Sequence, residues 1–139
     1  MEHKQLLTVF NSLPVGIGFF TADGTLVRCN ESFCRIFGAD SQTLLGNKLN
    51  INENSVVPDV VKEAVRRCVP VQMSFLYDFD KQRTDKRFFS TRTRTCYLKC
   101  NGNPLYDNDG KFVNYIFIFE DITETVKSEE AVSYTHLRA

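Results

Sequence analysis

Five cysteines and two histidines are the side chains of this 139-residue chain best suited to redox, metal-binding or nucleophilic chemistry. The cysteines are Cys29, Cys34, Cys68, Cys96 and Cys100. No two of them have the Cys-x-x-Cys spacing, so the sequence indicates neither a disulfide framework nor a zinc knuckle. On one strand, Cys96 and Cys100 would lie about 13 Å apart, too far for a disulfide. We therefore expect reduced thiols that pack as small apolar side chains.

The histidines, His3 and His136, stand near opposite ends of the chain. The chain therefore has too few histidines, too far apart, to favour a Cys-His dyad or a His-rich metal site, and we expect no metal site. The carboxylates fall mainly in expected turns and on expected helix faces, so the sequence offers no acid–base set for catalysis. These observations disfavour an enzyme.

The composition is that of one soluble domain. Hydrophobic residues make up 42% of the chain, and its 12 Phe, without any Trp, should dominate the core. Lys and Arg number 17, as do Asp and Glu, so no net charge attracts nucleic acid or an anionic membrane. The longest apolar stretches, such as Tyr115–Phe119, are far shorter than the ~20 residues of a membrane span. We expect a cytoplasmic protein with no nucleic-acid partner and no membrane insertion.

The first half of the chain should form helices and a β-hairpin. Apolar residues at helical spacing up to Pro14 predict an N-terminal amphipathic helix. Asp23-Gly24 separates two strand-like runs, as in a tight hairpin turn. Asn30 is a suitable N-cap for a helix that Gly38 ends. The expected elements are a helix over 1–13, strands over 15–21 and 25–29, helices over 31–37 and 41–46, and a loop or single helical turn over 47–55.

The second half should form one longer helix and three strands. Apolar residues at three- and four-residue spacing predict the main helix over 56–69, which Pro70 ends. Val71–Phe79 alternates, with apolar side chains at odd positions, as in a strand. The remaining expected segments are a charged loop over 80–87, a strand over 88–100, an irregular end over 101–104, a turn over 107–110 and a strand over 112–120. No regular βαβ repeat occurs, which favours an α+β fold with an antiparallel sheet.

Five short motifs, each weak alone, occur in a specific order along the chain. They are the turn Asp23-Gly24, the helix start Asn30-Glu31-Ser32-Phe33 with its end at Gly38, Leu44-Leu45-Gly46, the segment from Pro104 to Asp109-Gly110, and the exit Asp121-Ile122-Thr123-Glu124. Together they resemble the PAS domain, a sensory module common in bacterial signalling proteins. The resemblance spans about residues 6–124. It implies a PAS-like five-stranded antiparallel sheet with helices packed on one face, which together enclose a ligand pocket, and a module that catalyses nothing.

The resemblance also implies how the chain is divided and how it passes a signal. The N-terminal helix would cover 1–13, the sensor domain 14–124, and a C-terminal linker helix 125–139, whose end departs from the usual coupling helix and looks like a truncation or sequencing remnant. The implied relay residues are Asn30, Asp121, Ile122 and Thr123. In this relay the carboxylate of Asp121 and the hydroxyl of Thr123 tie the last strand to the following helix. A plainer reading, equally open, is that Asp121 only caps that helix.

When Pro104 and Asp121 are matched to the family pattern, the strand pleat implies which side chains face the pocket. The candidate pocket residues are Phe33, Phe37, Phe75, Arg94, Cys96, Leu98, Cys100, Tyr115, Phe117 and Phe119. Phe117 stands where many cofactor-binding relatives have a small residue, so the interior should be small or already filled. Two readings stay open: a pocket for a small ligand, or an aromatic core that binds nothing.

A dense basic segment runs from Lys81 to Arg94, partly offset by Asp80 and Asp85. Charge runs of this kind are usually solvated faces of hairpins. The alternative is that Arg94, with Arg92, points into the mouth of the pocket. It would then pair with a carboxylate or phosphate of a ligand, since a guanidinium binds such groups through two parallel hydrogen bonds.

The sequence lacks the side chains that hold two cofactors in related sensors. An adduct-forming flavin needs a Cys in an Asn-Cys-Arg motif directly after the helix-ending Gly, but Asn47-Lys48 follows Gly46. Haem-binding relatives use a His of the main helix, and residues 56–69 contain none. Cys68 is better explained as a buried thiol than as a haem ligand. We therefore predict no cofactor, with adduct-forming flavin and His-ligated haem disfavoured, and an unknown small ligand left open.

The sequence thus favours a non-catalytic sensory module of a bacterial signalling protein, most often a histidine kinase, whose effector domain is missing from the chain. The alternative is a ligand-free module for dimerisation or protein interaction. Ile116 and Ile118 make the outer sheet face apolar, so either the N-terminal helix or a second copy should cover it, and we favour a homodimer through both surfaces. Tyr134–Arg138 faintly resembles a phosphoacceptor segment, but His136 is not expected to act as one.

Overall fold

Five strands form one sheet in the computed structural model, which describes residues 3–85 and 90–129. Their bounds are β1 Gly16–Phe20, β2 Leu26–Cys29, β3 Val71–Asp78, β4 Thr95–Tyr106 and β5 Phe112–Asp121. The strands lie in the order β2-β1-β5-β4-β3, and each neighbouring pair is antiparallel. The expected five-stranded antiparallel sheet of an α+β fold is confirmed.

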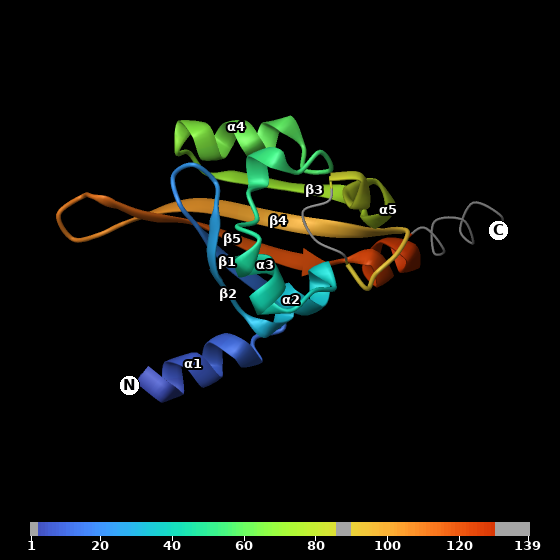
Figure 1. Cartoon of the computed structure of the whole chain (residues 1–139), viewed down its shortest axis with the longest axis horizontal. Helices are drawn as coiled ribbons and strands as arrows, with labels where there is room; N and C mark the ends of the chain where they lie inside the picture. Colours follow the sequence, from blue (N-terminus) through green and yellow to red (C-terminus); the bar gives the residue numbers. More distant parts are fainter. Residues whose placement is uncertain (1–2, 86–89, 130–139) are drawn as a thin grey trace.

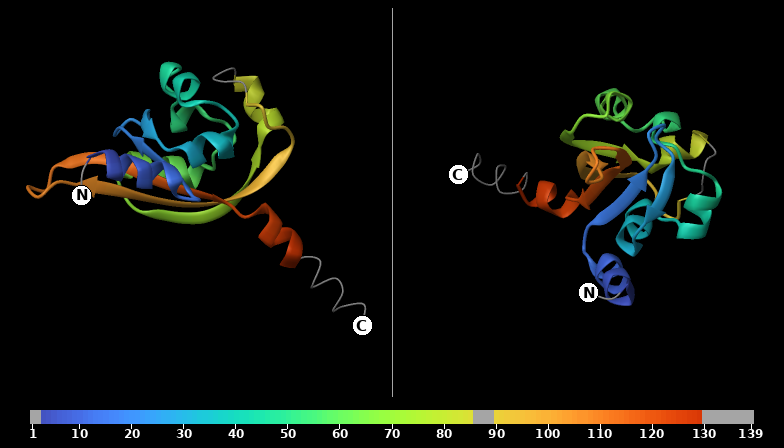
Figure 2. Two further views of the ribbon diagram at one scale, coloured as in Figure 1. Left: turned by 90° about the horizontal axis from the view of Figure 1, so that it is seen from below. Right: turned by 90° about the vertical axis from the view of Figure 1, so that its left-hand side faces the viewer.

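Short helices surround this sheet (Figure 1). Their bounds are α1 His3–Ser12, α2 Glu31–Phe37, α3 Ser41–Gly46, α4 Asp59–Arg67 and α5 Phe79–Gln82, with 3-10 turns η1 Ile51–Glu53 and η2 Arg83–Asp85. The sheet is bent, and α2, α3 and α5 lie over its concave side (Figure 2), while α4 packs against β3 and β4. Residues 123–129 form a further helix after β5. The hydrophobic core therefore lies between the concave face of the sheet and these helices.

The side chain of Asn30 sets where α2 begins, as the sequence predicted. Its Oδ1 accepts hydrogen bonds from the N–H groups of Phe33 (3.0 Å) and Ile17 (2.9 Å), which caps α2 and ties it to β1. Its Nδ2 donates to the carbonyl oxygens of Phe10 and Val15, both at 3.0 Å. One buried amide thus joins α1, β1 and α2.

α2 lies so close to β1 that the strand has room only for glycine at two positions facing the helix. A Cβ on Gly16 would come within 2.9 Å of the Phe33 Cα and of the Ile36 Cδ1. A Cβ on Gly18 would lie 2.8 Å from the Phe33 ring. At Gly16 a side-chain rotation cannot relieve the contact, because one of the two atoms belongs to the helix backbone. The two glycines are therefore what allows the helix to pack onto the strand.

Aromatic rings fill the space between α2 and the sheet. Ring centroids lie 4.7 Å apart for Phe33–Phe37, 5.3 Å for Phe37–Phe119 and 5.4 Å for Phe20–Phe117. All five side chains are buried. Burial of each such ring contributes about 1.5–3 kcal/mol to folding, so this cluster makes a large contribution to the stability of the core.

The structure corrects the expected bounds of β4. The strand begins at Thr95 and not at residue 88, because the chain before it follows the end of α2: the Thr91 N–H donates to the Gly38 carbonyl at 2.7 Å. The backbone of Arg94 then turns through a left-handed conformation, with φ of 63°, before the strand starts. β4 also continues to Tyr106 through the segment expected to be irregular, because β3 pairs with it as far as Gly102 and β5 pairs with it as far as Tyr106.

Two other segments differ from expectation. The main helix is shorter than residues 56–69, because Cys68 adopts a left-handed conformation with φ of 56° and ends it. The charged segment expected as a loop begins with α5 and η2. The Asp78 carboxylate caps α5 by accepting hydrogen bonds from the N–H groups of Asp80 and Lys81, both at 3.0 Å.

Some expectations fall on residues 86–89 and 130–139, which lie outside the described residues. They concern Lys86 and Arg87 of the basic segment, the nature of the C-terminal end, and the segment Tyr134–Arg138 with His136. Within 3–85 and 90–129, the helices are all too short or too polar to cross a bilayer.

Replacing Gly16 by Ala should destabilise the domain, because the new methyl group would press on the backbone of α2. We expect the free energy of unfolding, measured by urea titration, to fall by about 1–3 kcal/mol. Gly46→Ala is the matched control, since a Cβ at Gly46 meets no atom within 4 Å. Equal unfolding midpoints for the wild type and Gly16→Ala would contradict the close approach of α2 to β1.

Candidate functional site

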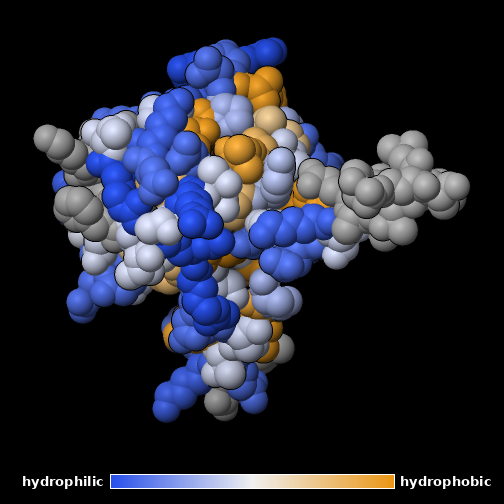
Figure 3. All heavy atoms as spheres, turned by 90° about the vertical axis from the view of Figure 1, so that its right-hand side faces the viewer, coloured by the Kyte–Doolittle hydropathy of each residue, from blue (hydrophilic) through white to orange (hydrophobic). Residues whose placement is uncertain are grey.

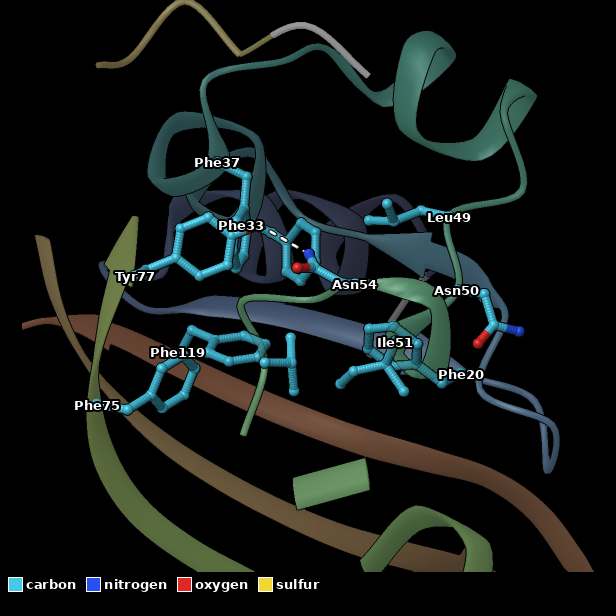
Figure 4. A pocket seen from close by; sticks show the side chains of 11 residues that line it. Phe20, Phe33, Phe37, Leu49, Asn50, Ile51, Asn54, Phe75, Tyr77 and Phe119 are labelled. Atoms are coloured by element: carbon cyan, nitrogen blue, oxygen red, sulfur yellow. Dashed lines mark hydrogen bonds between the residues drawn. The ribbon is translucent and has the colours of Figure 1, made fainter. Parts of the chain in front are cut away.

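A small cavity lies between α2, the segment 49–57 and the concave face of the sheet (Figure 4). Its volume is about 30 Å³, enough to hold a very small molecule and far below the roughly 300–1,000 Å³ of pockets for drug-sized ligands. Among the described residues that line it, none is charged. The lining residues are Phe20, Phe33, Phe37, Leu49, Asn50, Ile51, Asn54, Val57, Phe75, Tyr77 and Phe119.

Aromatic rings from three elements define one side of the cavity. Phe37 of α2 packs edge-on against Tyr77 of β3 and Phe119 of β5, with both centroid distances at 5.3 Å. Such perpendicular packing is the favoured geometry for aromatic pairs. Phe75 is two residues before Tyr77 on the same face of β3 and is only half-buried, so the cavity comes near solvent at this strand.

Two asparagines interrupt the apolar wall. The buried Asn54 Nδ2 donates to the Tyr77 hydroxyl at 2.8 Å, and its Oδ1 accepts from the Val56 N–H at 3.0 Å. Asn50 is held by the hairpin, because its Nδ2 donates to the Asp23 carbonyl at 3.0 Å. The Asn54–Tyr77 pair is therefore the polar feature that a bound molecule would meet.

Contacts continue from the cavity wall to Arg92. The Tyr77 and Phe79 ring centroids lie 4.9 Å apart, and the Arg92 guanidinium carbon lies 4.8 Å from the Phe79 centroid, a cation–π contact. The Arg92 guanidinium also donates to the Ile36 carbonyl at 2.9 Å and forms an ion pair with Asp121 at 3.1 Å. Arg92 thus joins the start of α5, the last turn of α2 and the end of β5.

Asp121 and Thr123 organise the exit from β5. The Asp121 Oδ1 accepts hydrogen bonds from the Thr123 N–H at 3.0 Å and from the Thr123 hydroxyl at 2.5 Å. The Thr123 hydroxyl oxygen in turn accepts from the Tyr97 N–H at 3.0 Å, and the Ile122 N–H donates to the Tyr97 carbonyl at 2.9 Å. The start of the helix over 123–129 is therefore bound to β4 as well as to Arg92.

Opposing effects act on the pKa of Asp121. Burial raises it, but the hydrogen bonds from Thr123 and the charge of Arg92 outweigh burial and hold the pKa below its ordinary value of 3.8. The carboxylate is therefore ionised at neutral pH, as the ion pair requires.

The end of the molecule that carries α5 and the exit presents a mainly hydrophilic face (Figure 3).

The sequence of this chain matches the model of a known protein family, which agrees with the fold and the exit segment described above. The family model described as the PAS fold matches residues 10–127. The chain belongs to the PAS-fold family. No curated protein sequence matches it. The resemblance indicated by the sequence motifs is thus confirmed.

Solved structures share the fold of this PAS domain at low sequence identity. The PAS domain of a protein from Colwellia psychrerythraea has a TM-score of 0.64 and 16% identity, covering 87% of this chain and 97% of that one. A PAS domain from a two-component sensor histidine kinase has a TM-score of 0.60 and 14% identity, covering 85% and 94%. An RNA-binding light-oxygen-voltage receptor has a TM-score of 0.68 and 17% identity over 97% of this chain, which spans only 38% of that receptor.

The structure brings part of the predicted pocket set to the cavity. The predicted residues that line it are Phe33, Phe37, Phe75 and Phe119. Five others are buried in the core on the same side of the sheet, as the pleat implied, but do not line the cavity: Cys96, Leu98, Cys100, Tyr115 and Phe117. Their packing leaves only a small space in the PAS core.

The predicted inward orientation of Arg94 is wrong. The residue precedes β4, its φ is 63°, and its side chain is exposed, so the alternation of a strand does not apply to it. Arg92 turns instead towards Phe79 and Asp121. Neither guanidinium lines the cavity, so neither Arg92 nor Arg94 offers a cation to an anionic ligand there.

The sequence pattern did not identify the wall opposite the sheet. Leu49, Ile51 and Asn54 lie in a stretch without a periodic signal, where η1 folds them over the cavity. The expected main helix includes Val57, but α4 starts at Asp59 and Val57 lines the cavity. Tyr77 could have been found, because it shares the odd-numbered, apolar face of β3 with Phe75.

The cavity of this PAS domain does not fit the cofactors of related sensors. The rings of Phe33, Phe37 and Phe119 occupy the space between α2 and the sheet, and about 30 Å³ holds no flat ring system. In addition, the sequence after Gly46 supplies no thiol, and α4 contains no histidine.

Asp121→Asn should remove the ion pair with Arg92 and lower the free energy of unfolding at pH 7 by about 1–3 kcal/mol. Because the folded pKa of Asp121 is lowered, its stabilisation is present above the unfolded value near 3.8 and is lost as the pH falls through the folded value. Urea unfolding between pH 7 and about pH 2 should therefore show a smaller acid-induced loss in Asp121→Asn. Asp109→Asn, in an exposed turn, is the control and should follow the wild type. Parallel curves for the wild type and Asp121→Asn would count against the ion pair.

Proposed function

We propose that this PAS domain is a non-catalytic sensory module of a bacterial signalling protein and that it binds a small, uncharged, mostly apolar molecule in its cavity. One observation carries the proposal: unbroken contacts lead from the cavity wall to the exit. Tyr77 packs on Phe79, Phe79 lies beneath Arg92, and Arg92 pairs with Asp121. A molecule that displaces Tyr77 therefore acts on the residues that start the helix after β5.

The walls of the cavity determine the chemistry of the ligand. A charged molecule would lie unpaired in apolar surroundings, which costs several kcal/mol. The hydrogen bond between Asn54 and Tyr77 provides one polar contact that a ligand can join or displace. A molecule of few non-hydrogen atoms fits the volume, and movement of the half-buried Phe75 would admit a larger one.

The signal would be a shift between two populated arrangements of the exit. In the arrangement described here, Asp121 and Thr123 hold the helix over 123–129 against β4. Binding beside Tyr77 would move Phe79 and Arg92, since the three side chains are packed in series, and would weaken or strengthen the Arg92–Asp121 pair. The effector we propose is a cytoplasmic histidine kinase, and the fold likeness to a PAS domain from a sensor histidine kinase supports this.

Filling the cavity tests the ligand proposal. Val57→Phe places a ring in the cavity wall, whereas Val60→Phe places the same ring at a position that is 59% exposed. Xenon is the probe, because it enters apolar cavities. We expect xenon to shift the amide NMR signals of Tyr77 and Phe119 in the wild type and in Val60→Phe, but not in Val57→Phe. Val57→Leu, a smaller change, should give an intermediate response.

The same spectra test the relay, and a second measurement tests for a natural ligand. The amide signals of Tyr97 and Thr123 at the exit should shift together with those of the cavity. Native mass spectrometry and an absorption spectrum of the freshly purified protein should reveal a molecule that copurifies. If xenon shifts the amide signal of Tyr77 but not that of Tyr97, the proposed relay is wrong, while the proposed ligand cavity stands. A protein that carries no molecule and ignores xenon would defeat the ligand proposal.

Dimerisation is a second candidate function, favoured by uncovered apolar side chains. Leu6, Leu7 and Val9 of α1 are 53%, 40% and 47% exposed. Ile118, on the outer sheet face, is 37% exposed, so α1 does not cover it within one chain. A second copy packed on α1 and on the outer face would bury these side chains, and we propose a homodimer on this basis.

Charges placed on the apolar side of α1 should prevent dimerisation. In Leu6→Lys/Val9→Lys, each added ammonium would have to be buried in the interface, so we expect the mass from light scattering to fall to that of a single 16.0 kDa chain. Gln5→Lys/Thr8→Lys adds the same charge at exposed polar positions of the helix and should remain dimeric. A wild type with the mass of one chain at every concentration would refute the homodimer.

A further inference from the structure

Two of the cysteines meet at the start of α2. The Sγ of Cys29, the last residue of β2, lies 3.9 Å from the Sγ of Cys34 in α2. Both residues are half-buried, whereas Cys96 and Cys100 are buried in the core. The spacing in the sequence did not predict this contact, because a strand end, the cap residue and one helical turn are needed to bring the two sulfurs together.

We propose that Cys29 and Cys34 are a redox site: they form a reversible intramolecular disulfide with a low-molecular-weight disulfide, such as oxidised glutathione, as the oxidant. The S–S bond length is about 2.0 Å, so the two sulfurs must approach by roughly 2 Å from their present contact. Rotation of the two half-buried side chains, with a small shift of the first turn of α2, supplies such a movement. The proposal departs, for this pair only, from the expectation of reduced thiols that pack as small apolar side chains.

The exchange proceeds in two balanced steps. The Cys34 thiolate attacks one sulfur of the external disulfide, whose S–S bond breaks, and the other half leaves as a thiolate. The Cys29 thiolate then attacks the Cys34 Sγ, which forms the protein disulfide and releases the second half. The two thiol protons of the protein end on the two released thiolates, so the cysteines lose two electrons and the external disulfide gains them.

The surroundings make this exchange slow but permit it. Burial raises the pKa of Cys29 to about 12, and the charge of a Cys34 thiolate adds to the effect. Burial also raises the pKa of Cys34. A small thiolate fraction suits a site that responds to sustained oxidation and not one that turns over rapidly. Once Cys34 is in a mixed disulfide its charge is gone, and Cys29 ionises more easily.

The residues between the two sulfurs anchor the N-terminal helix. Asn30 donates to the carbonyl oxygens of Phe10 and Val15, and the Glu31 N–H donates to the Asn11 Oδ1 at 3.1 Å. A disulfide across this turn restrains the donors that hold the end of α1. The redox state of the pair would therefore set how firmly α1 is attached to the domain.

Peptide mapping of the full chain tests the proposal. Trypsin releases both sulfurs in one peptide, residues 29–35, while the other cysteines fall in different peptides. The folded chain is equilibrated in glutathione buffers of graded ratio, alkylated and digested. We expect peptide 29–35 to lose two hydrogens at ratios that leave the other cysteines reduced. The same titration in urea should need a buffer more oxidising by at least about 30 mV, a tenfold difference in the equilibrium constant.

Two variants and two further measurements complete the test. Cys34→Ser should gain at most one glutathione on Cys29, and Cys68→Ser should titrate like the wild type. Since a bond favoured by the folded state must also stabilise that state, the oxidised protein should melt at a higher temperature than the reduced one. Its Glu31 amide should also exchange with deuterium more slowly. A bond no more stable in the folded chain than in urea, or melting and exchange unchanged by oxidation, would overturn the proposal.

Discussion

The close packing of α2 on β1 is the constraint on which the other features depend. It requires Gly16 and Gly18 on the strand, where any Cβ would press on the helix, and Asn30, whose side chain fixes the helix start to the same strand. Because the helix lies this close, the rings of Phe33 and Phe37 must occupy the concave side of the sheet. The small volume of the cavity is thus a consequence of backbone packing and not of one bulky residue.

The same helix connects the two ends of the domain. Its first turn carries Cys34 and the groups that hold α1, and its Ile36 carbonyl accepts a hydrogen bond from Arg92, which pairs with Asp121. α2 has only 7 residues, so it spans about 10 Å and moves as one unit. The N-terminal helix, the cavity and the exit are therefore all in contact with one short helix or its cap.

The sequence predicted correctly the features that depend on neighbouring residues. It did not predict the features that depend on contacts between segments far apart in the chain. The cap at Asn30, the stop at Gly38 and the pleat of β5 are local, and each was found. The start of β4 depends on a hydrogen bond between Thr91 and the end of α2, more than fifty residues away along the chain, and no periodicity records it. The wrong orientation predicted for Arg94 follows from the wrong start of β4, since Arg94 precedes the strand in a left-handed conformation and the alternation of a strand does not apply to it.

The contacts at the exit are weak enough for the small ligand proposed above to shift them. Such a ligand gains at most about 1.5 kcal/mol for each non-hydrogen atom, so only a few kcal/mol are available to shift an equilibrium. The cation–π contact of Arg92 with Phe79 is worth about 0.5–2 kcal/mol, and its ion pair with Asp121 is partly exposed and comparably weak. A fully buried ion pair at this position would exceed what the ligand supplies and would hold the exit in one state. Under the proposed function, the partial exposure of the Arg92–Asp121 pair keeps its energy within the range that such a ligand can shift.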